Sequence, residues 1–131
     1  MRLWHQLLIS KLPKAQLLGQ HRELCALRGN GWGRRHSVVN YVFLYPYSFL
    51  YYFHLIVIME MEKRRFKIDS KWKNMCYRGK TLGYDYSAFT DDIVPTQDII
   101  YFEHDSNYLN ECLNNLASKG IHINNIKRKK D

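Results

Sequence analysis

Residues 41–59 read YVFLYPYSFLYYFHLIVIM, and these 19 residues carry no formal charge. The length would suit a membrane-spanning helix. However, a proline, a serine, a histidine and five tyrosines would place polar groups at bilayer depth. We therefore interpret Tyr41–Tyr45 as a short extended segment and Tyr47–Arg65 as a buried helix, and we keep a membrane span as the weaker alternative.

A second helix is predicted on the N-terminal side of this stretch. Pro13 suits a first helical turn after Ser10 as a candidate cap, and Gly29 is a natural stop after Arg28. The apolar face carries Leu17, Leu24 and Cys25, whereas a different face carries Gln16, Gln20 and Glu23.

The C-terminal side predicts loops and one more helix. Residues 81–104 look irregular, and Asn107–Lys119 reads as an amphipathic helix that Asp105 or Ser106 caps and Gly120 ends. The expected fold is all-α, a single compact helical domain with long irregular loops over residues 1–126, followed by a basic tail at 127–131.

Charge is distributed unevenly over the 131 residues, whose formal net charge is +8. Residues 1–80 hold 15 basic and 4 acidic side chains, whereas residues 81–118 hold 7 acidic and no basic ones. Such asymmetry indicates a positive N-terminal surface, and nucleic acid is the commonest polyanion for so basic a protein. A mixed, solvated surface without a partner is the alternative.

The segment Gly29–His36 is a glycine-rich turn that contains Arg34 and Arg35. Glycines let backbone amides approach a phosphate, and the two arginines could pair with one. A plain turn between helices explains the same residues equally well, and no Walker lysine–serine pair follows.

Cysteine and histidine spacings predict neither disulfides nor a metal site. Cys25, Cys76 and Cys112 are scattered without a C-x-x-C pair, which fits a reducing cytosol. We see no histidine grouping of the zinc type, and no apolar signal peptide precedes the domain. We expect a cytoplasmic monomer without metal or cofactor, and no membrane partner.

Three segments in roughly the first half of the chain carry a resemblance: Leu8–Leu12 (LISKL), Leu17–Leu24 (LLGQHREL) and the helix His54–Ile68. In these segments the chain resembles the pyrimidine-dimer DNA glycosylases of phages and bacteria. The MRLWH start is typical of the bacterial branch. Gln16 stands where the phage enzyme has a histidine, and Ala26 where it has an arginine.

This resemblance implies a glycosylase and abasic-site lyase that acts on damaged pyrimidines in duplex DNA. By the family's pattern, the α-amine of Met1 would attack the sugar C1′ and form an imine, and Glu23 would stabilise the cationic transition state. An α-amine with a pKa near 7.7–8.0 is partly neutral at pH 7, as a nucleophile must be. The expected DNA contacts are Arg2, Arg22, Arg28, Arg34 and Arg35.

Two other functions remain open from the sequence. The chain could be a non-catalytic basic nucleic-acid-binding protein, in which Arg22, Arg34 and Arg35 contact phosphates. It could also be a small membrane protein that spans residues 41–59. Without the resemblance, Glu23 and Arg22 would be ordinary residues of a helix surface.

Overall fold

A computed structural model describes residues 2–29, 39–86 and 93–124 of the chain. The elements in order are η1 (Gln6–Lys11), α1 (Lys14–Arg28), η2 (Asn40–Leu44), α2 (Tyr47–Lys63), η3 (Ser70–Lys73) and α3 (Ser106–Ser118). The described part of the chain contains no strand, only an isolated bridge between Tyr77 and Tyr84. The predicted all-α fold class is therefore confirmed.

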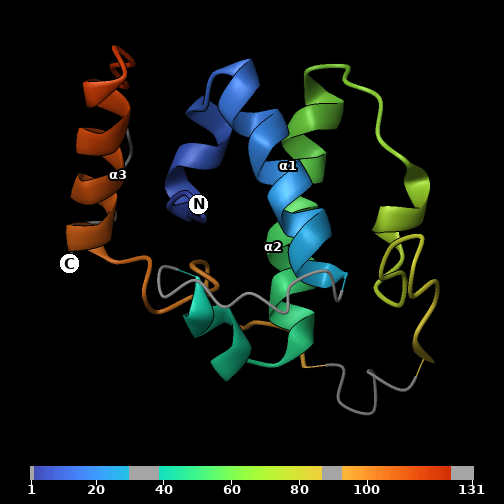
Figure 1. Cartoon of the computed structure of the whole chain (residues 1–131). Coiled ribbons are helices and arrows are strands. Elements are labelled where there is room, and N and C mark those ends of the chain that lie inside the picture. The colour runs from blue at the N-terminus through green and yellow to red at the C-terminus, as the bar shows by residue number, and fades with distance from the viewer. Residues whose placement is uncertain (1, 30–38, 87–92, 125–131) are drawn as a thin grey trace.

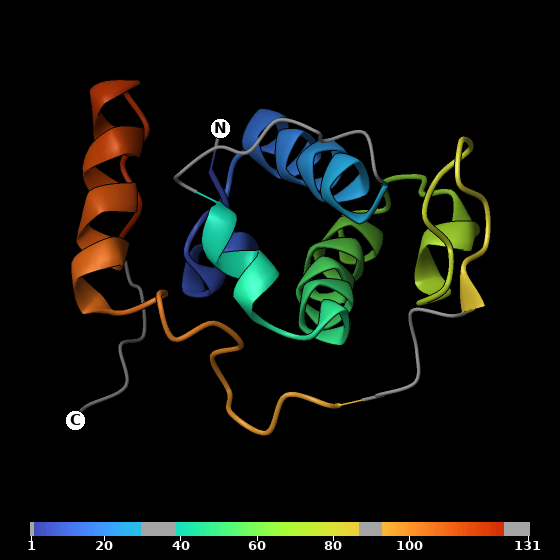
Figure 2. The ribbon, with the colours of Figure 1, turned by 60° about the horizontal axis from the view of Figure 1, so that its bottom comes forward.

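Helices α1 and α2 pack against each other and form the centre of the fold. The N-terminal segment with η1 lies between this pair and α3, whereas residues 66–86 lie on the opposite side (Figure 1, Figure 2). The start of the chain is thus placed between two helices that come from opposite ends of the sequence.

Prolines and a glycine set the boundaries of the first two helices. Pro46 directly precedes α2, as the sequence predicts, and Pro13 directly precedes α1, one position outside the first helical turn in which the sequence places it. Gly29 ends α1 with its N–H bonded to the Cys25 carbonyl, and a Cβ at this position would lie 3.0 Å from the carbonyl oxygen of Arg78. A close backbone approach therefore explains this glycine.

Three expected local structures are wrong. Ser10 lies within η1 and does not cap α1, whose N-cap residue is Pro13. Tyr41–Tyr45 is not extended, because η2 covers Asn40–Leu44. Helix α2 ends at Lys63, two residues before the predicted Arg65, which adopts a left-handed φ of 64°.

Helix α3 agrees with the expected Asn107–Lys119 to within one residue at each end. The Asp105 side chain accepts a hydrogen bond from the Tyr108 amide, and Gly120 follows with a φ of 78°. The C-terminal basic tail, residues 127–131, lies outside the described residues. Among the described residues, α2 included, no helix has both the length and the apolarity needed to cross a bilayer.

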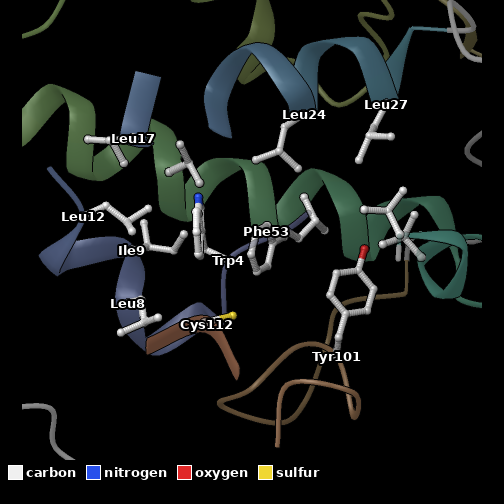
Figure 3. Packing of buried hydrophobic residues seen from close by; sticks show 14 of the residues in the cluster. Trp4, Leu8, Ile9, Leu12, Leu17, Leu24, Leu27, Phe53, Tyr101 and Cys112 are labelled. Carbon is white, nitrogen blue, oxygen red and sulfur yellow. The ribbon is translucent and has the colours of Figure 1, made fainter. Parts of the chain in front are cut away.

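The core joins the N-terminal segment, the two central helices, α3 and the loop before α3. Figure 3 shows side chains from the N-terminal segment, both central helices, α3 and the loop residue Tyr101 pointing toward one another. Phe53 of α2 and Cys112 of α3 are fully buried there, as are Leu17 and Leu24 of α1. Each such aliphatic or aromatic side chain contributes about 1.5–3 kcal/mol on burial, so this shared core holds the N-terminal segment and α3 to the central pair of helices.

Candidate active site

A pocket of about 380 Å³ opens between α1, the end of α3 and the first residues of the chain. We call it the α1–α3 pocket. Its lining comprises Arg2, Trp4, Ala15, Gln16, Gly19, Gln20, Glu23, Asn115 and Lys119. The face of α1 that the sequence predicts for Gln16, Gln20 and Glu23 is thus the helical wall of this pocket.

Two cations and an indole form one side of the pocket. The guanidinium of Arg2 lies 6.0 Å from the ring centroid of Trp4, and the ammonium of Lys119 lies 5.6 Å from it. Trp4 is nearly buried, whereas Lys119 is exposed at the end of α3. The arrangement gives the pocket a positive edge that suits an anionic ligand such as a phosphate.

Glu23 is the acidic residue of the pocket lining. Only 8% of its surface is exposed, although a carboxylate is normally solvated. The residue lies three positions after Gln20 on the same face of α1, and Gln20 is 98% buried. A nearly buried acid beside a cationic edge is an arrangement that can stabilise a positive charge developing on a bound sugar.

The backbone of the N-terminal segment is bonded to α1 at the pocket. The amide nitrogen of Trp4 donates to Oε1 of Gln20 at 2.6 Å, and Nε2 of Gln20 donates to the Arg2 carbonyl at 3.3 Å. Met1, the candidate nucleophile, lies outside the described residues. Arg2, its neighbour, lines the same pocket as Glu23.

Comparison with known proteins identifies a family. A family model described as pyrimidine dimer DNA glycosylase matches residues 1–74, which is more than half of the chain. The chain belongs to this family. No curated protein and no solved structure matches the chain.

The family match includes only part of the α1–α3 pocket. Residues 1–74 contain Arg2, Trp4 and the pocket face of α1, whereas Asn115 and Lys119 come from beyond the matched region. Sequence reasoning missed these two residues of the glycosylase-family chain. Lys119 had a detectable signal, since it is the basic residue at the end of an amphipathic helix whose other face is buried.

The arginines expected to contact DNA in this family member differ in their surroundings. Arg22 is exposed on α1, beside the pocket face, and Arg2 is half-buried at the pocket. Arg34 and Arg35 lie outside the described residues.

Arg28 is fully buried, and the sequence-based expectation of a DNA contact does not fit its position. The five guanidinium donors reach the Tyr47 hydroxyl, His54 Nδ1 and three backbone carbonyls. Those carbonyls belong to Trp72, Asn74 and Tyr77, at 2.7, 2.8 and 3.2 Å. Arg28 is therefore a structural residue that fastens residues 72–77 to the two central helices.

A cluster of His21, Cys25 and His54 lies beside Arg28 and was not anticipated. Nδ1 of His21 lies 2.9 Å from Nε2 of His54, and the Cys25 sulfur is 3.7 Å from Nε2 of His21. Their ligand-type atoms all lie within 4.8 Å of one another, close enough for a metal ion. The i,i+4 spacing of His21 and Cys25 on one helix was a signal in the sequence.

The donors at this cluster leave His54 poorly suited to a metal. Arg28 only donates, so Nδ1 of His54 must be the acceptor of their 2.9 Å contact and a neutral ring then carries its proton on Nε2. A protonated Nε2 has no lone pair for a cation. Burial and the adjacent Arg28 charge lower the pKa of His54, and burial raises the pKa of the Cys25 thiol to about 12.

Proposed function

We propose that this family member is a DNA glycosylase with abasic-site lyase activity, acting on damaged pyrimidines in duplex DNA through its N-terminal amine. The observation that carries the proposal is the α1–α3 pocket, where the first residues of the chain and the nearly buried Glu23 line one cavity. The family match supports a DNA substrate.

The reaction needs only groups of the chain. The neutral amine attacks C1′ as the bond from C1′ to the base breaks, and the departing base takes a proton. The attached nitrogen loses its proton, and the C1′–O4′ bond then breaks with a proton passing to O4′, which opens the sugar ring and leaves an imine at C1′. Removal of a C2′ proton then allows β-elimination, in which the C3′–O bond breaks and the 3′ phosphate leaves. Glu23 would stabilise the positive charge at C1′ and assist proton transfer, and the target nucleotide or its partner must leave the base stack.

Phosphate contacts would come from the positive edge of the pocket. Arg2 and Lys119 flank Trp4, and Arg22 projects from the exposed side of α1. Such contacts position a duplex without reading its sequence. We expect the protein to act as a monomer without metal or cofactor, because an amine and a carboxylate suffice for these steps.

Borohydride trapping on an abasic-site duplex tests the proposal. Borohydride reduces an imine to a stable amine, so we expect a covalent protein–DNA adduct that disappears when the N-terminal amine is acetylated. Glu23→Gln should retain some adduct and slow strand cleavage, since it removes the acid and keeps the nucleophile. Salt-sensitive duplex binding without any adduct would instead indicate a non-catalytic binding protein.

A further inference from the structure

We propose that Gln20 is a positioning residue, which sets the distance between the N-terminal amine and the carboxylate of Glu23. The inference rests on the proposed function, since it assumes that the amine is the nucleophile. It concerns a residue that the reaction chemistry itself does not require.

The side-chain amide of Gln20 forms a two-point contact with the backbone of the N-terminal segment. Its Oε1 accepts from the Trp4 amide and its Nε2 donates to the Arg2 carbonyl. A backbone N–H only donates and a carbonyl only accepts, so a single orientation of the Gln20 amide satisfies both. The contact therefore fixes the register of the segment along α1.

Helix α3 also binds the N-terminal segment, at Leu3, the residue between Arg2 and Trp4. The Tyr108 hydroxyl of α3 donates to the carbonyl of Leu3, whose side chain is fully buried. The backbone around Leu3 is thereby bonded to α1 through Gln20 and to α3 through Tyr108. The first residues of a chain are usually mobile unless such contacts hold them.

The geometry of α1 fixes the position of Gln20, which anchors the N-terminal segment, relative to Glu23. Gln20 and Glu23 are three residues apart on one face of α1, so their separation is set by the helix and not by tertiary packing. The Gln20 bond to Arg2 is one residue away from the amine. Since misplacing a reacting group by 1 Å can cost about a hundredfold in rate, loss of this anchor should slow imine formation.

Gln20→Met distinguishes the positioning role of Gln20 from a merely structural role, because the two roles predict different results. Methionine has a similar length and cannot form either hydrogen bond. We expect the single-turnover rate of adduct formation to fall on the order of 100-fold. The affinity for abasic-site duplex should stay within about twofold, because the cations are unchanged. Hydrogen exchange at the Trp4 amide should accelerate.

Ser48→Ala is the matched control. It removes a part-buried hydrogen bond, from the buried Ser48 hydroxyl to the Ile93 carbonyl at 2.6 Å, away from the α1–α3 pocket. A similar loss of stability with an unchanged adduct rate is expected, measured well below the melting temperature.

Two glycines inserted between Met1 and Arg2 provide a second variant should Gln20→Met fail to fold. Removal of Met1, which a small second residue permits, leaves the amine one residue further from Arg2, so the Gln20 contacts stay in place and the path to the amine lengthens by up to about 3.5 Å. We expect a comparable fall in rate with the Trp4 amide still protected.

Four outcomes would contradict the proposals: one contradicts the proposed function and three contradict the positioning role of Gln20. No adduct from the parent protein overturns the proposed function itself. If the parent forms the adduct, a Gln20→Met rate within about threefold of it overturns only the role of Gln20. Unchanged exchange at Trp4 in that variant, or full activity after glycine insertion, overturns it as well.

Discussion

The guanidinium of Arg28 donates to Nδ1 of His54 across 2.9 Å, which joins the end of α1 to the middle of α2. An arginine cannot lose its proton in a protein, so this contact determines where the protons of the neighbouring imidazoles lie. His54 then donates from Nε2 to Nδ1 of His21, at 2.9 Å. One buried cation thereby orients two histidines on two helices.

Replacing Arg28 should strongly destabilise the fold. Arg28→Gln removes a fully buried guanidinium and leaves three backbone carbonyls and the buried Nδ1 of His54 without their donors, so we expect a loss of about 3–5 kcal/mol in the free energy of unfolding. Urea denaturation followed by circular dichroism measures it.

Arg22→Gln is the matched control for this change, because it removes the same charge from the exposed side of α1. We expect its unfolding free energy to change by less than about 0.5 kcal/mol while its affinity for duplex DNA falls. Equal destabilisation by the two variants would contradict the structural role of Arg28.

Stability should decrease on acidification through the pKa of an unfolded histidine. Burial lowers the pKa of His5, His21, His54 and His104, the last to about 3. Below about pH 6.5 the unfolded chain binds protons that the folded chain does not. The unfolding free energy therefore falls with decreasing pH, by up to about 1.4 kcal/mol per pH unit for each histidine. His104 keeps contributing down to about pH 3.

Urea titrations between pH 7.5 and 4.5 measure this slope. His104→Gln should flatten it, because this replacement removes a buried imidazole whose pKa is lowered in the folded protein. A parent stability that is constant over this range would show that the buried histidines are protonated in the folded protein.

Zinc should not occupy the cluster of His21, Cys25 and His54. His54 offers no free lone pair while it accepts from Arg28, and a thiol with a pKa near 12 resists the deprotonation that zinc requires. We expect less than about 0.1 equivalent of zinc after equilibration and dialysis, and no rise in melting temperature. Stoichiometric zinc that Cys25→Ser abolishes would show that Arg28 gives up this contact.

The cations beside Trp4 should determine part of the salt dependence of DNA binding. Each phosphate contact adds about 0.9 to the slope of log affinity against log salt. Lys119→Gln and Arg2→Gln should each reduce that slope by about 1, uniformly across sequences. Lys63→Gln, on a different face of the molecule, serves as the control. An unchanged slope for Lys119→Gln would place the duplex elsewhere.

The sequence predicts the long helices well because their ends carry strong local signals. Pro13, Pro46 and Gly29 set boundaries that agree with the structure. Tyr41–Tyr45 was misread, because a short aromatic run between a loop and a proline carries no usable period and packing onto Tyr101 decides its conformation.

Spacing alone predicted the pocket residues that share a helix, whereas Arg2 was expected only through the family resemblance. Gln16, Gln20 and Glu23 fall on one face by spacing alone. Arg28 could not be distinguished from a surface arginine, because its partners are carbonyls 44 to 49 residues away that local patterns do not reveal. Asn115 reaches the pocket only through the docking of α3, which is likewise a tertiary event.

The contribution of α3 and Tyr101 to the core means that the family-matched half is not an independent folding unit. A fragment of residues 1–74 would keep Glu23 and most of the cations. However, it would expose the core side chains of Trp4, Leu8 and Phe53, and Arg28 would lose the Tyr77 carbonyl as a hydrogen-bond acceptor. Minimising this protein for engineering should therefore begin with its surface loops and spare the C-terminal helix.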